Sequence, residues 1–554
     1  MTTETLLIII ALIFAAGTIL LSRSSIKRHA GIIFMIRTGH GLKLMDTIAN
    51  LSPRIWRFVA DFSIALSFGG LGVYYVSGSR RVEKILLIFG AVAVSIYGFF
   101  YFVNGTHLLF LLASAAACAY LVISMFRESA GNRKIYGVIG FIFVSLITFA
   151  VMNTFIRDNP INDILNPLTA IMTGIAGLPA FLLCLMLNQA VQILMEMTKM
   201  PGISPLLPGV ASSGEIGFFF PGTGIFVPFW YLFIALIVTI VVHEVSHGIL
   251  ARVSKIPLKS VGLITVGILP IGAFVEPDED EMKKRPGIEK MRVFAMGSFA
   301  NLTTSIIAII AIIALGIFMS SVTAPAGMLI VGIMEDYPAF GKIEAGSVIS
   351  GVDGERVNSY ADFFRIIENT TAGQKLVLNV TECRSQENLK KSYKNNNSDE
   401  DAVKNNDEIL SIYYRASYFG VECEPQNYKT VTLAAAGHPD NSSRAYLGIS
   451  IAPDTVYSIK SDFLTNNHYL IGILSFIGFS LFWIFFINFN IALVNLLPVL
   501  PLDGGHMFGE LVNSMSTDKK IMELIISLAI MATLFLMLIN ASPLLDVFLR
   551  WIGL

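Results

Sequence analysis

The sequence predicts a polytopic α-helical membrane protein that carries one small soluble α+β domain. Its 554 residues are 54% hydrophobic and only 14% charged, with a mean hydropathy of +0.68, which is far more apolar than a soluble protein. Apolar runs of about 20 residues recur along the chain, and this length crosses ~30 Å of hydrocarbon. One polar stretch, residues 326–453, interrupts the series.

Ten apolar runs are candidates for membrane spans. They cover residues 5–21, 58–76, 85–103, 108–126, 135–155, 169–194, 226–253, 293–319, 469–497 and 521–539. The first run has no basic segment before it and no clear cleavage site after it. We therefore expect a retained span or anchor there, and not a removed signal peptide.

Polar chemistry is concentrated in the second part of the chain. Residues 1–200 are predicted to be a multi-span region of unassigned role, because their apolar runs carry few polar groups. Every motif described below follows Pro201, where we place a boundary. The remainder divides into a first core segment at 201–325, the soluble domain at 326–455 and a second core segment at 456–554.

Basic residues predict which loops face the cytoplasm. The segment that joins the runs at 226–253 and 293–319 is rich in them, with Arg252, Lys255, Lys259, Lys283, Lys284, Arg285, Lys290 and Arg292. We therefore expect this segment to be cytoplasmic and the soluble domain to lie outside.

Two earlier loops conflict with simple alternation of ten spans. They carry Arg80, Arg81 and Lys84, and then Arg127, Arg133 and Lys134, which also favour the cytoplasm. Alternation places these loops on the other side. One N-terminal run is therefore expected to be re-entrant, and the candidate is 169–194, which Gly174, Gly177 and Pro179 interrupt.

The polar stretch has the signals of a small folded domain. Residues 348–357 and 375–383 have strand and hairpin patterns, and 360–374 has helical periodicity that ends in glycine. Residues 384–408 are rich in Asn, Lys, Asp, Glu and Ser and have almost nothing to bury. We therefore expect a disordered loop there.

The four cysteines show no CxxC spacing, so they do not indicate a zinc cage or a redox motif. Cys118 and Cys184 lie in apolar runs and are expected to be small core residues. Cys383 and Cys423 share the soluble stretch. They either form a disulfide in an oxidising compartment or remain two solvent-side thiols.

Two histidines and a glutamate lie inside the apolar run at 226–253, where ionisable residues are costly and indicate a functional site. The sequence HEVSH places His243 and His247 four residues apart, so both project from one face of a helix and can hold one metal ion. Glu244 could then accept the proton of a water molecule that attacks a peptide carbonyl. The alternative is a chance match whose histidines only bond to neighbouring helices.

A catalytic zinc takes three protein ligands, so a third is expected elsewhere. Asp503 lies in NLLPVLPLDGGH, where prolines and Gly504 and Gly505 break the helix and let the carboxylate turn toward a facing helix. Taken alone, this stretch is typical of a turn at the membrane surface. Because the histidine pair needs a third ligand, Asp503 is predicted to bind the metal. His506 is a weaker candidate, more typical of a supporting or interfacial residue.

HEVSHG followed by NLLPVLPLDGGH resembles the site-2 protease family of intramembrane zinc metalloproteases, peptidase family M50. PIGAFVEP at 270–277 is similar to the membrane-associated β-loop of that family, and GSFAN at 297–301 to the pattern of its second core helix. The soluble insert resembles a PDZ domain. The resemblance covers about residues 226–539. Ser347, where such a domain often has aspartate, and the long insertion after Arg384 depart from the PDZ pattern and bear on peptide binding.

The resemblance implies specific site residues. His243, His247 and Asp503 would hold one Zn²⁺ per chain, and Glu244 would do the acid–base work. Asn495 would hold the backbone of an extended substrate. Asn495 together with Pro498 would shape the substrate cleft.

We therefore expect a zinc endopeptidase that lies in the lipid bilayer and cleaves transmembrane segments of membrane-protein substrates. The cell membrane is the expected location, with the active site toward the cytoplasm and the PDZ-like domain outside. A net charge of −1 offers no basic excess for phosphates, so no nucleic-acid partner is predicted.

Two other function classes are alternatives. A non-proteolytic membrane scaffold or chaperone with a structural metal is the main alternative, and Glu244 argues against it because a structural site needs no base. A metal or solute transporter would repeat acidic or histidine residues in two halves of the chain, and residues 1–200 show no such repeat.

Overall fold

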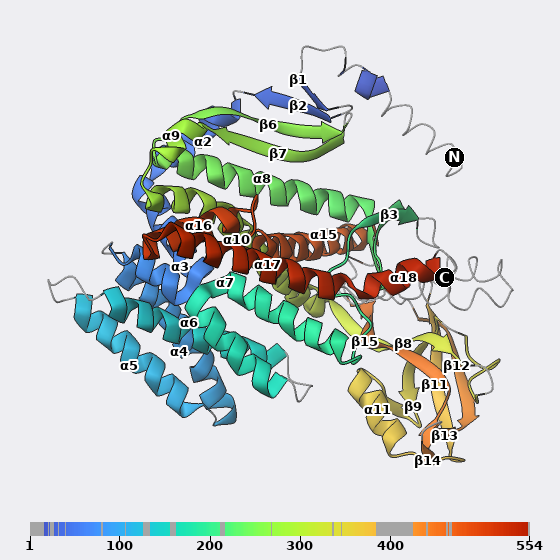
Figure 1. The fold of residues 1–554 in the computed structure, drawn as a ribbon. Coiled ribbons are helices and arrows are strands. Elements are labelled where there is room, and N and C mark those ends of the chain that lie inside the picture. Colours follow the sequence, from blue (N-terminus) through green and yellow to red (C-terminus); the bar gives the residue numbers. More distant parts are fainter. Residues whose placement is uncertain are drawn as a thin grey trace.

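The structure is a computed structural model. It describes residues 16–19, 22, 27–30, 33–38, 40–78, 81–105, 107–125, 133–155, 162–210, 216–266, 269–334, 337–344, 346–383, 425–438, 441–460, 464 and 468–551. A bundle of helices carries one sheet along its upper face and a strand-rich domain at its lower right (Figure 1). Most of the predicted run at 5–21, the expected loop at 384–408 and Cys423 lie outside the described residues.

Eight helices in the described part of the chain are long and apolar enough to cross a membrane. They are α3 (Pro53–Val76), α4 (Val82–Asn104), α6 (Arg133–Phe155), α7 (Asn162–Leu194), α8 (Phe229–Val253), α10 (Gly287–Val322), α15 (His468–Val494) and α17 (Lys519–Ala541). A shorter apolar helix, α5 (Leu108–Met125), follows α4. The predicted fold class, a polytopic helical membrane protein with a soluble insert, is confirmed.

Helix α7 folds back on itself at Gly177, whose φ of 69° and ψ of −150° are not helical. A straight helix would separate residues 162 and 188 by about 39 Å. Instead, the side-chain amide of Asn188 donates to Asn162 Oδ1 at 2.9 Å. Both ends of α7 therefore lie at the same end of the bundle, which is the geometry expected of the re-entrant run at 169–194.

Helix α3 is a second hairpin, which the sequence analysis missed. Phe68 and Gly69 leave the helical conformation. A Cβ atom on Gly72 would lie only 2.3 Å from the carbonyl oxygen of Ile64. Residues eight positions apart on a straight helix are about 12 Å apart, so the chain must turn back between them.

The two hairpins meet at their tips. A Cβ atom on Gly69 would lie 2.7 Å from the carbonyl oxygens of both Thr173 and Gly174, and one on Gly177 would lie 2.2 Å from that of Ser67. Gly69 and Gly177 also have positive φ values of 54° and 69°. Only glycine combines this backbone conformation with such a close approach.

The two hairpins resolve the conflict over the basic loops. Asp61 on α3 contacts Arg81, just before α4, and Arg292, near the start of α10. Arg133, at the start of α6, approaches Gly78, just after α3. The basic residues before α4, α6 and α10 therefore gather at one end of the bundle, as expected for a single cytoplasmic face.

A four-stranded antiparallel sheet lies over α8, with its strands in the order β1-β2-β6-β7. Its strands are β1 (Lys27–Ala30), β2 (Ile33–Thr38), β6 (Leu258–Val266) and β7 (Leu269–Pro277). The N-terminal strand β2 pairs along β6, so the segment before the helices extends the hairpin that follows α8. β7, which contains PIGAFVEP, forms the opposite edge of the sheet.

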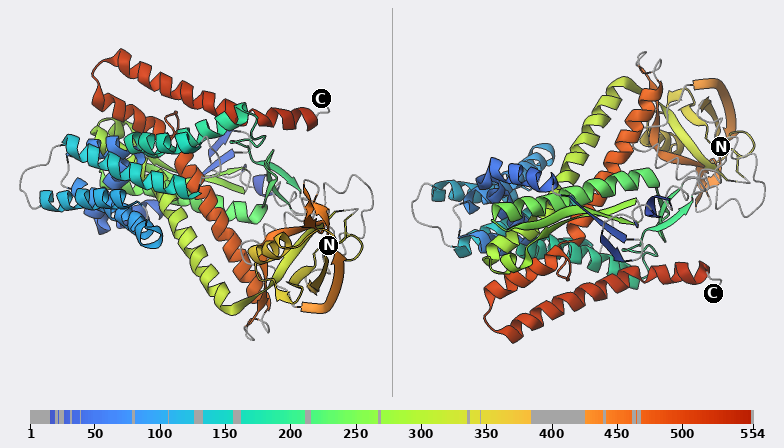
Figure 2. Two further views of the ribbon diagram at one scale, coloured as in Figure 1. Left: turned by 90° about the horizontal axis from the view of Figure 1, so that it is seen from below. Right: turned by 90° about the horizontal axis from the view of Figure 1, so that it is seen from above.

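Short elements flank this sheet and α8. They are α2 (His40–Leu51), α9 (Glu279–Lys283) and a small sheet of β3 (Leu207–Val210), β4 (Ile216–Phe220) and β5 (Ile225–Pro228). The chain ends with α16 (Asp503–Met515), α17 and α18 (Pro543–Trp551). In both views of Figure 2, α17 and α18 run along the outer edge of the bundle.

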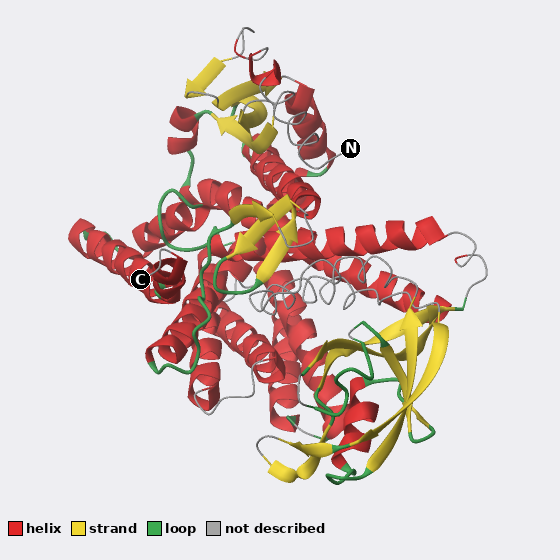
Figure 3. Cartoon of the chain, turned by 90° about the vertical axis from the view of Figure 1, so that its right-hand side faces the viewer, coloured by secondary structure: helices red, strands yellow, loops and turns green. Residues whose placement is uncertain are grey.

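The soluble insert has its own sheet and core. Its strands are β8 (Thr323–Ile333), β9 (Val348–Val352), β10 (Glu355–Arg356), β11 (Lys375–Cys383), β12 (Pro425–Ala434), β13 (Ala436–His438), β14 (Asn441–Tyr446) and β15 (Ile449–Ile459), with helix α11 (Tyr360–Glu368). The main sheet has the order β12-β11-β9-β8-β15. The predicted strands near 348–357 and 375–383 and the helix within 360–374 are present. Figure 3 shows the insert and the sheet over α8 as two separate strand-rich parts.

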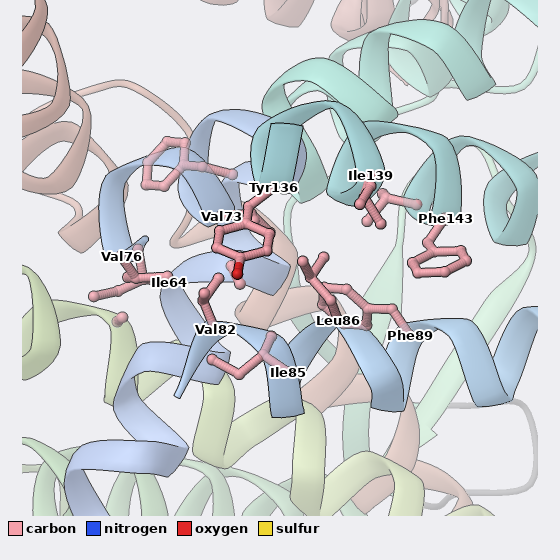
Figure 4. Packing of buried hydrophobic residues seen from close by; sticks show 14 of the residues in the cluster. Ile64, Val73, Val76, Val82, Ile85, Leu86, Phe89, Tyr136, Ile139 and Phe143 are labelled. Atoms are coloured by element: carbon pink, nitrogen blue, oxygen red, sulfur yellow. The ribbon is translucent and has the colours of Figure 1, made fainter. Parts of the chain in front are cut away.

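Residues before and after 201 share one hydrophobic core. Val73 and Val76 from α3, Leu86 and Phe89 from α4, and Tyr136 from α6 pack together (Figure 4). The same cluster includes Met291 and Ala295 of α10 and Met507 and Leu511 of α16. The N-terminal hairpin α3 is therefore packed into the helices that carry the sequence motifs.

Candidate metal centre

His243 and His247 lie on consecutive turns of α8, inside the apolar helix. With the usual rise per residue, His243 is about 21 Å along the helix from Phe229 and about 15 Å from Val253. The two Nε2 atoms are 3.1 Å apart. Their side chains are 15% and 12% exposed, so both imidazole rings are largely enclosed by the protein.

Asp503 completes the site from the first residue of α16. Its Oδ2 atom lies 3.3 Å from His243 Nε2 and 3.1 Å from His247 Nε2. Among the residues that the structure describes, these three form a group able to hold a metal ion. The structure therefore brings together the three predicted ligands, although Asp503 follows His247 by 256 positions in the chain.

The triangle of donor atoms fits zinc. Tetrahedral zinc with bonds of about 2.0–2.1 Å places its ligand atoms about 3.3 Å from one another. The three edges here are 3.1, 3.1 and 3.3 Å. Two imidazole nitrogens and a carboxylate oxygen are also a donor set that zinc accepts, and three ligands leave a fourth position open.

The other nitrogen of each imidazole has a partner on α10. His247 Nδ1 donates to the carbonyl oxygen of Val293 at 2.8 Å, which leaves the lone pair on Nε2 for a metal. The side chain of Asn301 lies 3.1 Å from His243 Nδ1.

The buried amide of Asn301 indicates the same tautomer for His243. As placed, its nitrogen faces His243 Nδ1, and its Oδ1 has no hydrogen-bond partner. Turning the amide group by 180° exchanges its oxygen and nitrogen with almost no change in shape and lets His243 Nδ1–H donate to Oδ1. We assign this orientation because it removes an unsatisfied buried oxygen and leaves His243 Nε2 free to bind metal.

Gly297 makes room for both rings. A Cβ atom there would lie 2.3 Å from His247 Nε2 and 2.7 Å from His243 Nε2. Val293, Gly297 and Asn301 follow one another at four-residue intervals and so line one face of α10. GSFAN thus contributes a close approach at Gly297 and a hydrogen bond at Asn301.

Asn495 holds Asp503 in place. Its side-chain nitrogen donates to Asp503 Oδ2 at 2.6 Å, and its backbone carbonyl oxygen accepts from the backbone nitrogen of Gly504 at 2.8 Å. Gly504 approaches Leu496 so closely that a Cβ atom would lie 2.1 Å from the Leu496 carbonyl carbon. The resemblance implied a substrate contact for Asn495, and this ligand-positioning contact was not anticipated.

Pro498 and His506 lie close in sequence to Asp503 but have different surroundings. Pro498 is buried in the turn between α15 and α16. The His506 ring stacks on Phe294 with their centres 4.7 Å apart and their planes at 7°. His506 is not part of the metal-binding group, in agreement with its lower ranking from sequence.

Glu244 is held by the edge strand of the sheet over α8. Its Oε2 accepts a hydrogen bond from the backbone nitrogen of Val275 on β7 at 3.0 Å. The strand thus fixes one oxygen of the carboxylate beside the histidine pair.

An apolar cavity of about 160 Å³ lies along α8 on the N-terminal side of the histidines. Ile240 and Val241 of α8 line it, together with Gly272 and Ala273 of β7 and Phe218 of β4. The cavity therefore lies between the sheet and the helix that bear Val275 and Glu244.

Asp61 is a buried ionisable residue that was not among those predicted from the sequence. Its side chain is fully buried between Arg81 and Arg292. The available signal was an aspartate inside the apolar run at 58–76, which marks a paired or functional group.

Comparison with known proteins agrees with this geometry. The sequence model of peptidase family M50 matches residues 231–539, which is more than half of the chain. An uncharacterized protein of Methanocaldococcus jannaschii is 28% identical over 275 residues, covering 50% of this chain and 55% of that protein. A membrane-bound transcription factor site-2 protease homolog of Arabidopsis thaliana is 24% identical over 137 residues, covering 24% of this chain and 26% of that protein. The matches thus span about half or less of these relatives.

Proposed function

The chain belongs to peptidase family M50, and we propose that it is a zinc endopeptidase that cleaves transmembrane segments of membrane-protein substrates within the bilayer. The observation that carries this proposal is the triangle of donor atoms that His243 and His247 of the apolar helix α8 form with Asp503 of α16, next to Glu244. Membership of the site-2 protease family agrees with it.

Each residue has a distinct part in the proposed reaction. His243, His247 and Asp503 would hold the ion, which supplies a Lewis acid that polarises an oxygen atom and eases its deprotonation. Glu244 takes a proton from the attacking water and passes it to the leaving amine. The Val275 N–H group holds Glu244 Oε2, so Oε1 is the oxygen that exchanges the proton.

The surroundings of the site suit an apolar peptide in an extended form. A helical substrate shields its peptide bonds by its own hydrogen bonds, so it must unwind before cleavage. The cavity along α8, which reaches Ile240 and Val241, is lined by apolar side chains and can take one from the substrate. Asn495 remains a candidate for a backbone contact, since its amide nitrogen is also 3.3 Å from His243 Nε2.

A structural metal site is less consistent with the donor set. Structural zinc is almost always enclosed by four protein ligands. The described residues supply three, which are 12–15% exposed. The open position and the adjacent Glu244 favour catalysis over a scaffold or chaperone with a structural ion.

The proposed orientation follows from the two ends of the bundle. The basic segment between α8 and α10 lies at one end of α10, and the soluble insert begins at the other. With the basic end in the cytoplasm of a cell membrane, the metal centre lies toward that side and the insert lies outside. The PDZ-like insert would then filter substrates by size or by a newly exposed terminus.

Cleavage of a membrane-segment substrate by the purified protein in detergent tests the function. The samples are wild type, Glu244→Gln, and wild type stripped with a chelator and then restored with zinc. We expect cleavage only by the untreated and the restored wild type, while Glu244→Gln still binds zinc. A Glu244→Gln protein that cleaves as fast as wild type, or a wild type that binds no zinc, contradicts the proposal.

A further inference from the structure

We propose that the N-terminal hairpin α3 positions the metal centre, with Asp61 and Ser63 as the positioning residues. This inference rests on the proposed zinc site and gives residues before the family match a part in it. The hairpin acts through α10, which lies between α3 and the two histidines.

Asp61 and Ser63 hold α10 on either side of the carbonyl group that orients His247. Asp61 Oδ1 accepts from Arg292 Nε at 2.8 Å, and Arg292 directly precedes Val293, the acceptor for His247 Nδ1. The Ser63 hydroxyl donates to the carbonyl oxygen of Ala295 at 2.8 Å. The position of the Val293 carbonyl is therefore restrained from both sides.

Two faces of α10 have separate tasks. Residues 292, 295 and 299 contact α3, the last through a T-shaped contact between Phe62 and Phe299 with ring centres 5.7 Å apart. Residues 293, 297 and 301 line the metal centre. Three consecutive residues of α3, from Asp61 to Ser63, thus contact the face of α10 that is opposite the face lining the metal centre.

The ion pair between Asp61 and Arg292 is almost completely buried. Asp61 is 0% exposed and the Arg292 side chain 10% exposed. Without Asp61, Arg292 keeps the contact with Glu289, whose other oxygen accepts from Ser254 at the end of α8. With the Arg292–Glu289 contact left and the contact to α3 lost, the first turns of α10 would take a different position. The Val293 carbonyl would move with them.

The hairpin is itself well anchored, so it can serve as a support. Its tip is fixed by the close approach of Gly69 and Gly177. Its start is tied to the end of α8 through Arg57, which donates to the Val253 carbonyl oxygen at 3.5 Å. An element restrained at both ends can transmit its position to the helix packed against it.

Zinc affinity of the full-length protein in detergent, measured by competition with a chelator, tests the proposal. We expect Asp61→Asn to weaken zinc binding by roughly tenfold, as loss of outer contacts to a metal ligand does. Ser63→Ala should weaken it in the same direction by a smaller factor. Arg81→Gln is the matched control, because Arg81 pairs with the same carboxylate from the start of α4, and its zinc affinity should equal that of wild type.

Two further measurements distinguish positioning from a general loss of stability. The visible spectrum of the Co²⁺-substituted protein should shift in Asp61→Asn but not in Arg81→Gln, since it reports the ligand geometry. Asp61→Asn combined with Arg292→Gln should bind zinc no more weakly than the weaker single variant, because both changes remove the same ion pair.

The outcomes separate this inference from the proposed function. A wild type that binds zinc together with an Asp61→Asn variant of equal affinity and unchanged spectrum overturns the inference alone. Additive losses in the double variant also overturn it. If Asp61→Asn does not fold, Ser63→Ala decides, and an affinity equal to wild type overturns the inference. A wild type that binds no zinc overturns both.

Discussion

A Cβ atom on Gly297 would lie 2.3 Å from the Nε2 atom of His247, the nitrogen that faces the other two ligands. Gly297→Ala should therefore displace the imidazole rings and weaken zinc binding by about 100-fold or more. Gly316→Ala, on the same helix, is the control, because nothing lies within 4 Å of its Cβ position. Equal zinc affinity in both variants would show that α10 can move away from the histidines.

We expect the side-chain oxygen of Asn301, and not its nitrogen, to form the hydrogen bond with His243 Nδ1. Asn301→Asp keeps an acceptor for His243 Nδ1–H and should bind zinc nearly as tightly as wild type, whereas Asn301→Leu should lose about 10- to 100-fold in affinity. Asn490→Leu is a suitable control, since Asn490 is exposed and donates to its own helix. Chelator competition is the measurement. An Asn301→Asp variant as weak as Asn301→Leu would contradict the assigned orientation.

The two re-entrant hairpins predict a specific topology. In a cysteine-free background, new cysteines at Gly78 and Lys134 should react with a membrane-impermeant maleimide from one side only, and those at Gly105 and Met195 from the other. All four positions are exposed in the structure. We expect the first pair on the cytoplasmic side, where the basic residues gather. Labelling of Met195 from the same side as Gly78 would mean that α7 crosses the membrane.

The soluble insert should be removable without loss of the metal centre. Its first and last strands pair with each other, with Met328 opposite Thr455, and its core is formed by its own residues. Joining Met328 to Thr455 through an Asn-Gly turn closes this hairpin. We expect zinc affinity to stay at the wild-type value, because no ligand lies in the insert.

The same deletion tests whether the insert filters substrates. Wild type should cleave a pre-trimmed substrate faster than the full-length one, and the deletion variant should cleave both at similar rates. A preference of equal size in both proteins would rule out the filter. Separate measurement of zinc affinity shows whether any loss of cleavage comes from damage to the site.

Elements with a local signal were predictable from the amino-acid sequence. Apolar runs of span length predicted the membrane helices, because hydrocarbon thickness sets their length. The four-residue spacing of His243 and His247 predicted a shared helix face, and the need for a third ligand singled out Asp503. Helix-breaking residues in the run at 169–194 indicated the α7 hairpin.

Contacts between groups far apart in the sequence could not be predicted in the same way. The fold-back of α3 has a weak local signal, because a glycine pair within an apolar run is also compatible with a straight helix. The contact of Asn495 with Asp503, the space beside Gly297 and the chain from Asp61 through Arg292 to the Val293 carbonyl all depend on packing between separate helices. Such contacts form because buried polar groups must find partners and small residues let backbones approach, and the partner chosen is a property of the whole fold.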